Sequence, residues 1–267
     1  MSETNELDRL LGARDFGPQY FPEVFRLLRE SPLIFLMPYH PELVGTEETM
    51  RSGDPMPQFA LWSSDEQGRT IPVFTSVACA QDGCRKVGTP ANTYVFAQMV
   101  GKDLFDLLRR LPEGVAINPA CRTSVLFLDG AALCKLADGS ILDPEPGELK
   151  ESTANIVDAA DYPTDFLQPL FCFLRTRPEV RAAWLLRETE ELPGAPVSYV
   201  FVLQLDGKAP EVERDFRLVA RSACPKDAEY GVTLLDRKNK SMMAMAKEST
   251  PFYAAPGFRP PGRRRAA

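Results

Sequence analysis

Two strand-like segments of the chain end in side chains that could hold a ligand or take part in catalysis. The segment "IPVF" (71–74) runs into Thr75 and Ser76, and "VAI" (115–117) runs into Asn118. Hydroxyl and amide groups at strand ends beside helix N-termini are well placed to bind a small polar molecule. Thr75, Ser76 and Asn118 are therefore the candidate ligand-binding residues, on the expectation that neighbouring strands carry them.

Each of these endings also has a purely structural interpretation. The sequence alone does not decide between ligand binding and a structural role. A helix is expected around 76–83, and a hydroxyl at its N-cap would accept a hydrogen bond from an otherwise unpaired amide, contributing about 1 kcal/mol. Asn118 can close a turn, because its side chain mimics turn hydrogen bonds and Pro119 holds it in an extended conformation.

Catalysis by Ser76 has little support in the sequence. A nucleophilic serine needs a base, and the only histidine, His40, lies in a loop before a proline. No G-x-S-x-G motif surrounds Ser76, and neither a G-x-G-x-x-G nor a G-x-x-x-x-G-K-[ST] phosphate loop occurs. The sequence therefore predicts a protein that is not an enzyme, with no catalytic residue and no cofactor.

The six cysteines offer one further candidate site. None of them forms a C-x-x-C pair, and Cys79 and Cys84 in "CAQDGC" come closest to one. With a single histidine in the chain, a zinc site would need a second cysteine pair at ligand spacing. We expect buried, reduced thiols and no metal, and a small redox or metal role for Cys79 and Cys84 is the alternative.

The segments around these residues alternate between helical and strand patterns, which predicts an α+β protein. A hairpin is expected from "PQFALWSS" and "TIPVFTS", and a clear helix from "GKDLFDLLRRLPEG". A stretch rich in Pro, Gly and charge, "LDPEPGELKESTAN", marks a linker between two mixed α/β-sheet domains. The predicted boundaries are 1–142 for the first domain, 143–160 for the linker, 161–254 for the second domain and 255–267 for a disordered tail.

Charge and hydropathy argue against two classes of partner, general nucleic acids and membranes. The formal net charge is -6 and the sequence pI about 5.1, which is poorly suited to a phosphate backbone, so nucleic-acid binding is not expected. No stretch approaches the roughly 20 apolar residues that span a bilayer, and the N-terminus lacks the pattern of a signal peptide. We expect a cytoplasmic protein without membrane contact.

Four short segments of the first half resemble the core of the SseB family, the bacterial proteins named for an enhanced serine sensitivity phenotype. The second half resembles the separate C-terminal domain of that family. The segments that carry the resemblance are "IPVFTS", "GKDLFDLLRRL", "VAINPA" and "SVLFLDG" in the first half, and "FLQPLFCFLRTRPEVRAAWLL", "YGVTLLD" and "STPFY" in the second.

The resemblance implies a non-enzymatic module and supplies no catalytic residues. Some members occur beside bacterial secretion and toxin systems, which implies a secretion-system-associated adaptor or a toxin-immunity protein. The expected function is therefore protein binding, and an acidic chain suits a basic partner. The alternative is an amino-acid sensor, or an enzyme linked to serine metabolism, with its pocket at Thr75, Ser76 and Asn118.

Overall fold

The structure is a computed structural model that falls into two compact units. Residues 1–16 and 23–141 form the first unit, and residues 17–22 and 142–267 form the second. Each unit carries helices and its own mixed sheet, so the predicted α+β class with two domains is confirmed. The residues that the structure describes are 5–39, 56–64, 68–90, 93–121, 123–144, 155–158, 164–189, 198–225, 228–236 and 238–259.

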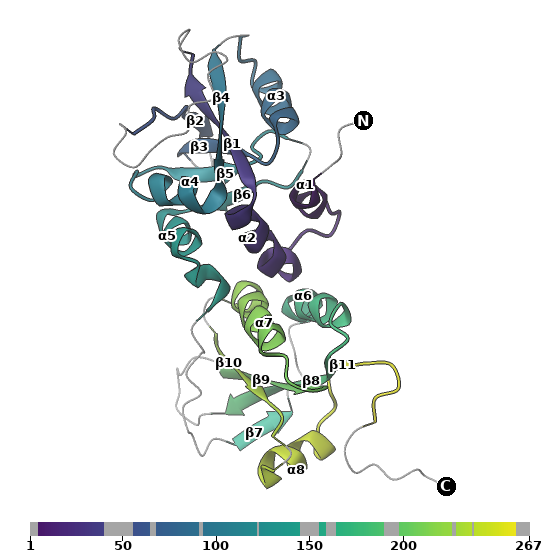
Figure 1. Cartoon of the computed structure of the whole chain (residues 1–267). Helices are drawn as coiled ribbons and strands as arrows, with labels where there is room; N and C mark the ends of the chain where they lie inside the picture. Colours follow the sequence, from purple (N-terminus) through teal and green to yellow (C-terminus); the bar gives the residue numbers. More distant parts are fainter. Residues whose placement is uncertain are drawn as a thin grey trace. The chain divides into compact units, whose positions relative to one another are not determined.

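The first unit is built on a six-stranded sheet (Figure 1). Its strands follow the order β4-β1-β3-β5-β6, and β2 pairs with β3. The pairs are antiparallel except β3 and β5, which run parallel, and the predicted hairpin is the antiparallel pair β2 and β3. The strand bounds are β1 (Pro32–Pro38), β2 (Trp62–Ser64), β3 (Gly68–Phe74), β4 (Tyr94–Val100), β5 (Gly114–Ile117) and β6 (Leu126–Leu128).

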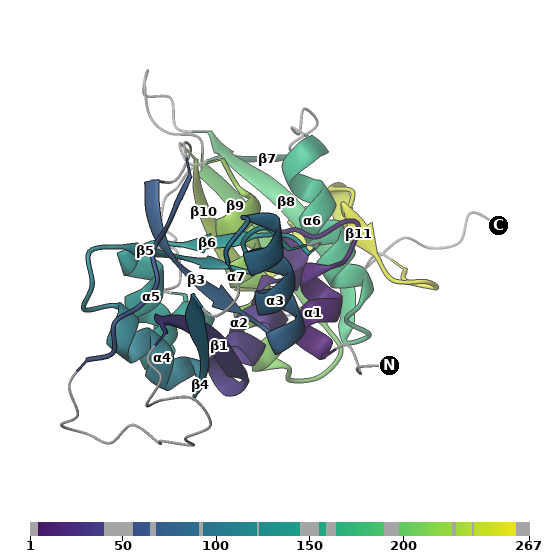
Figure 2. The same ribbon diagram turned by 90° about the horizontal axis from the view of Figure 1, so that it is seen from above.

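Helices pack on both faces of this sheet. In Figure 2, β1 and β3 lie between α3 on one side and α4 and α5 on the other. Ala80 of α3 packs against Ile34 and Phe74, and we call this side of the sheet the α3 face. The helix bounds are α1 (Glu6–Leu11), α2 (Phe21–Glu30), α3 (Val77–Lys86), α4 (Gly101–Leu108) and α5 (Gly130–Asp138). A short 3-10 turn, η3 (Ser140–Leu142), follows α5, and another, η1 (Pro18–Tyr20), belongs to the second unit.

The second unit is a five-stranded sheet with helices on both faces. The strand order is β10-β9-β8-β11, β7 pairs with β8, and β9 and β10 run parallel. Its elements are β7 (Asn155–Asp158), α6 (Thr164–Arg175), β8 (Val180–Thr189), β9 (Ser198–Leu205), α7 (Pro210–Ala223), β10 (Glu229–Leu234), α8 (Lys240–Glu248) and β11 (Tyr253–Ala254).

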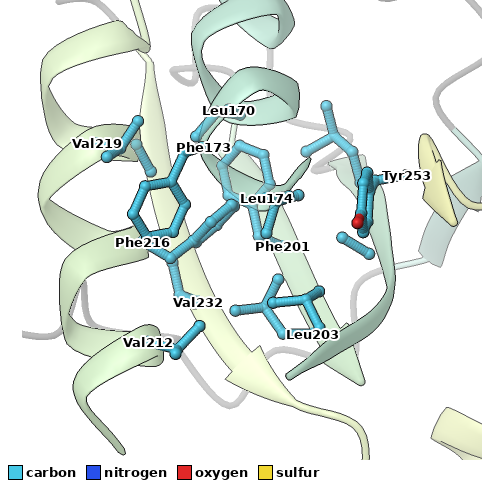
Figure 3. Packing of buried hydrophobic residues seen from close by; sticks show 14 of the residues in the cluster. Leu170, Phe173, Leu174, Phe201, Leu203, Val212, Phe216, Val219, Val232 and Tyr253 are labelled. Carbon is cyan, nitrogen blue, oxygen red and sulfur yellow. The ribbon is translucent and has the colours of Figure 1, made fainter. Parts of the chain in front are cut away.

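The core of the second unit lies between its sheet and the helices α6 and α7 (Figure 3). Phe216 of α7 is central, because its ring centroid lies 5.4 Å from that of Phe201 on β9 and 6.2 Å from that of Phe173 on α6. On the opposite face, buried Trp184 packs with Met242 and Met245. Because successive side chains of β8 point to opposite faces of the sheet, its apolar side chains contribute to the core under α6 and α7 and to the cluster around Trp184.

Two segments outside the predicted second domain are packed against its sheet. Asn155–Asp158, placed by the sequence in the linker, forms β7 and pairs with β8. Residues 255–259, assigned to a disordered tail, instead contact the same strand: the Ala255 amide donates to the Arg181 carbonyl at 2.9 Å, and Phe258 meets the Trp184 ring edge-on at 6.0 Å. Both segments lacked a strong apolar pattern, and tertiary pairing decides their structure.

Candidate functional site

The three residues that the sequence selected lie at one edge of the first sheet. Because β3 and β5 are parallel neighbours, with Val73 opposite Ile117, their carboxyl ends meet there. The Asn118 amide donates to the Val73 carbonyl at 2.8 Å, which extends the pairing by one residue. Thr75 and Asn118 are thereby brought into direct contact.

Asn118 and Thr75 are joined by a pair of hydrogen bonds between buried groups. The Thr75 backbone amide donates to Asn118 Oδ1 at 3.0 Å, and Asn118 Nδ2 donates to Thr75 Oγ1 at 2.9 Å. Nδ2 also donates to Thr123 Oγ1 at 3.1 Å. The Thr75 hydroxyl has a single proton, and its closest acceptor is a carboxylate oxygen of Asp8.

The backbone after Asn118 turns sharply. The turn at Asn118 is present, but the extended conformation expected before Pro119 is wrong: Asn118 has φ 53° and Ala120 has φ 58°, both in the left-handed region. Asparagine tolerates this region better than other residues with a Cβ. The Cys121 amide donates to the Asn118 carbonyl at 3.2 Å and closes the turn. The turn carries Cys121 back toward the first turn of α3, where its thiol lies 3.2 Å from the Cys79 carbonyl oxygen.

The structure confirms that Ser76 is a helix cap, as the structural interpretation of its position predicted. It is the N-cap of α3, and its hydroxyl accepts from the Cys79 amide at 3.2 Å. The first helix is anchored at the same sheet edge by Asn5, whose Nδ2 donates to the Thr75 carbonyl at 2.9 Å while its Oδ1 caps α1 through the Asp8 amide. Two helix N-termini therefore converge on the end of β3.

The polar groups of this edge are largely engaged with one another. Thr75 is 4% exposed and Asn118 0%, and both side chains hydrogen-bond within the protein. Ser76 is half-buried and its oxygen is occupied by a helix amide. Binding of a small ligand by these three residues stays a prediction. His40, the only candidate base, lies outside the described residues.

The chemically reactive group at this edge is the thiol of Cys79. It lies in the first turn of α3, half-buried, with its Sγ 3.7 Å from the Asp8 carboxylate and 3.9 Å from Thr75 Oγ1. The acceptors within reach of the Cys121 proton are the carbonyl oxygen of Cys79 at 3.2 Å, that of Pro119 at 3.6 Å and the sulfur of Cys79. A cysteine in the first turn of a helix also benefits from the helix dipole when it ionises.

These contacts lower the pKa of Cys79 to about 6, far below the ordinary range of a thiol. The largest cause is the hydrogen bond from the Cys121 thiol, and the hydroxyls of Ser76 and Thr75 add to it. Partial burial and the Asp8 carboxylate act in the opposite direction. The pKa of Cys121 is raised in turn, because its proton is held by Cys79. Cys79 is therefore the thiol of this pair that ionises first.

The sequence analysis considered Cys84 as the partner of Cys79, whereas the cysteine that contacts Cys79 in the structure is Cys121. Cys79 and Cys84 lie five positions apart on one α-helix, so their side chains point roughly 140° away from each other. Both pack at the edge of the same apolar cluster, yet it is Cys121 that contacts Cys79. Among the described residues, no group of three or more His, Cys, Asp or Glu side chains that could hold a metal ion is found.

We expect Cys79 to be alkylated by iodoacetamide with a half-maximal rate at a pH of about 6, because the reactive species is the thiolate. Cys84, whose pKa burial raises, serves as an internal reference that reacts only at higher pH. Cys121→Ala should move the midpoint of Cys79 upward, whereas Cys121→Ser, which keeps a hydrogen-bond donor, should move it less. Peptide mass spectrometry after timed quenching measures each site. A midpoint of Cys79 above pH 8 would contradict the assignment.

Sequence reasoning missed Asp8, Asn5 and Cys121 as members of this site. Cys121 follows the end of β5 by only four residues, and Cys79 follows the end of β3 by five. The expectation that these two strands end side by side therefore already implied that the two cysteines lie close together. Asp8 and Asn5 could not be found in this way, because nothing in the sequence of α1 indicates which edge of the sheet it reaches.

Comparison with known protein families extends over both units. The family model described as SseB protein N-terminal domain matches residues 7–131, and that described as SseB protein C-terminal domain matches residues 150–254. Together they cover most of the chain, and the site at the end of β3 lies within the first match. No curated protein and no solved structure matched the chain. No helix in the described part of the chain is long and apolar enough to cross a membrane.

Proposed function

The chain belongs to the SseB family over both of its domains, and from that premise we propose that it is a non-enzymatic, cytoplasmic protein-binding module. The role that fits best is a secretion-system-associated adaptor or a toxin-immunity protein, in which binding is itself the activity. The observation that carries the proposal is the pair of exposed aromatic side chains, Phe96 and Phe127, on the α3 face of the first sheet.

These two phenylalanines lie on the same side of the sheet, at its two edges. Phe96 on edge strand β4 is paired with Leu36 of β1, and Phe127 on edge strand β6 is paired with Ala116 of β5. Directly paired residues share a face, and so do residues two apart on one strand. Leu36 lies two residues from Ile34, the partner of Phe74, and Ala116 is paired with Pro72, two residues before Phe74. Both phenylalanines therefore lie on the side where Phe74 packs under α3. Phe96 is 38% exposed and Phe127 45% exposed.

The α3 face is unequally covered because α3 is short. Its ten residues bury the middle of the sheet around Ile34, Leu36 and Phe74, and the side chains on both edges stay accessible. Aromatic side chains are enriched in the buried centres of protein–protein interfaces. Edge strands also offer backbone groups that another chain can pair with. A partner that covers this face would therefore bury both phenylalanines.

The charge of the chain indicates what kind of protein would bind. A formal net charge of -6 repels a second copy and attracts a basic partner, and electrostatic attraction acts mainly on the rate of encounter. Burial of Phe96 and Phe127 would supply affinity that salt does not remove. The amino-acid sensor is less well supported, because Thr75 and Asn118 already bind each other.

We expect the tagged protein to capture one abundant, stoichiometric, basic protein from an extract of its own host. Raising the salt concentration from about 0.1 M to 0.5 M should slow association while leaving most of the complex intact, because screening weakens steering more than apolar contact. Mass spectrometry of the eluate and its stoichiometry are the measurement. A blank eluate at low salt, or a partner lost completely at moderate salt, would count against the proposal.

A further inference from the structure

Two thiols from distant parts of the sequence meet at the carboxyl edge of the first sheet. Cys79 lies in the first turn of α3, and Cys121 lies 42 positions later in the turn that follows β5. The Cys121 Sγ is 3.2 Å from the carbonyl oxygen of Cys79 and 3.6 Å from that of Pro119. Both cysteines are free and only partly buried, so a small oxidant can reach them.

From this juxtaposition we propose that Cys79 and Cys121 form a redox modification site, in which a hydroperoxide oxidises Cys79 and Cys121 then closes a reversible disulfide. The site is independent of the proposed protein binding, and either could fail without the other. It differs from the Cys79 and Cys84 pair that the sequence suggested, because residues five apart on one helix cannot reach disulfide geometry.

The surroundings of Cys79 favour it as the attacking group. The sulfur lies in the first turn of α3, whose N-cap is Ser76, and the hydroxyls of Thr75 and Ser76 lie within hydrogen-bonding reach. These groups, together with the Cys121 thiol, keep the pKa of Cys79 near 6 in spite of the Asp8 carboxylate 3.7 Å away. The charged groups that face Cys121 are Asp82 and Lys86 of α3, which act on it in opposite directions.

The reaction proceeds in two balanced steps. The Cys79 thiolate attacks the terminal oxygen of the hydroperoxide, an S–O bond forms as the O–O bond breaks, and the leaving alkoxide takes up a proton as an alcohol. Cys121 then attacks the sulfur of the resulting sulfenic acid, an S–S bond forms as the S–O bond breaks, and the departing hydroxide leaves as water with the Cys121 proton. Two thiols and one hydroperoxide thus give one disulfide, one alcohol and one water.

The first step prepares the second. The hydrogen bond to Cys79 is the largest cause of the raised pKa of Cys121, and the negative charge on Cys79 adds to it. Conversion of Cys79 to a neutral sulfenic acid removes both effects, so Cys121 ionises more readily once it is needed. The product would link the start of α3 to the turn after β5, and a dithiol would reverse it.

The test uses the full chain, reduced and then treated with about one equivalent of hydrogen peroxide before the remaining thiols are alkylated. Trypsin separates "LPEGVAINPACR", with Cys121, from the peptide that holds both Cys79 and Cys84. We expect these two peptides to be joined under non-reducing conditions and released by dithiothreitol. In Cys84→Ser, the matched control, the linked product should form to the same extent.

Two further variants make the outcome decisive. Cys79→Ser should lose the linked product completely. Cys121→Ser should lose it too, and its Cys79 should accumulate a sulfenic acid that dimedone traps, a signature that a packing role alone would not give. The proposal is overturned if peroxide leaves Cys79 and Cys121 alkylated as free thiols, if the link runs to Cys84 or to another chain, or if no dimedone adduct forms in Cys121→Ser.

Discussion

Gly101→Ala is expected to destabilise the first unit by about 3 kcal/mol or more, a large part of the stability of an ordinary domain. Gly101 opens α4, where the helix passes against the end of α2. A Cβ at this position would lie 1.7 Å from the carbonyl oxygen of Leu28 and 2.8 Å from its carbonyl carbon. Both atoms are backbone, so the two helices must separate, which loosens the bond from the Gly101 amide to the Ser31 carbonyl (3.0 Å).

Gly130→Ala is the matched control for this prediction. Gly130 stands at the same first position of α5, and a Cβ there would meet no atom within 4 Å. We expect its unfolding free energy to be unchanged or raised by up to about 1 kcal/mol, because alanine restricts the unfolded chain. Urea unfolding can be followed by Trp62 fluorescence in a common Trp184→Phe background, since these are the two tryptophans and each lies in a different unit. Equal stability of the two variants would refute the close approach of α2 and α4.

Asn118→Ala is expected to cost about 3 kcal/mol of unfolding free energy in the same assay. The substitution leaves the buried Thr75 amide without its acceptor and removes two donated hydrogen bonds from the Asn118 side chain. It also places alanine at φ 53°, which costs roughly 1 kcal/mol more than for asparagine or glycine.

Asn118→Gly separates the two causes. Glycine adopts the left-handed conformation freely but cannot replace the amide, so we expect it to be less destabilising than alanine by about 1 kcal/mol and still clearly destabilising. If neither variant changed the unfolding free energy, the amide would have no structural role. A Tm increase on adding a free amino acid, lost in Asn118→Ala, would then favour the sensor interpretation.

The sequence predicted most elements of the fold because their patterns are local. The strand "IPVF", the helix that begins after Ser76, and the turn at Asn118 each depend on apolar periodicity and capping chemistry within a few residues. The expectation that Thr75 and Asn118 lie at neighbouring strand ends follows from the same patterns, and the structure places them in contact.

The remainder depends on contacts between distant segments. The anchoring of α1 at the end of β3 requires Asn5 to reach Thr75, 70 positions away. The pairing of Cys79 with Cys121 requires β3 and β5 to be parallel neighbours, whereas spacing along the chain favoured Cys84. The strand β7 forms by pairing with β8, and Phe258 is placed by its contact with Trp184 of β8. No local pattern in either segment indicates these contacts.

The central claim is that the chain binds a protein through the α3 face, and capture by a variant with that face altered tests it most directly. The variant is Phe96→Asp with Phe127→Asp, and the control is Leu234→Asp, which adds a charge at an exposed apolar position of the second unit. We predict that wild type and control recover the same stoichiometric basic partner, whereas the double variant, folded by circular dichroism, recovers less than about one tenth as much. Equal recovery by all three proteins would contradict the account.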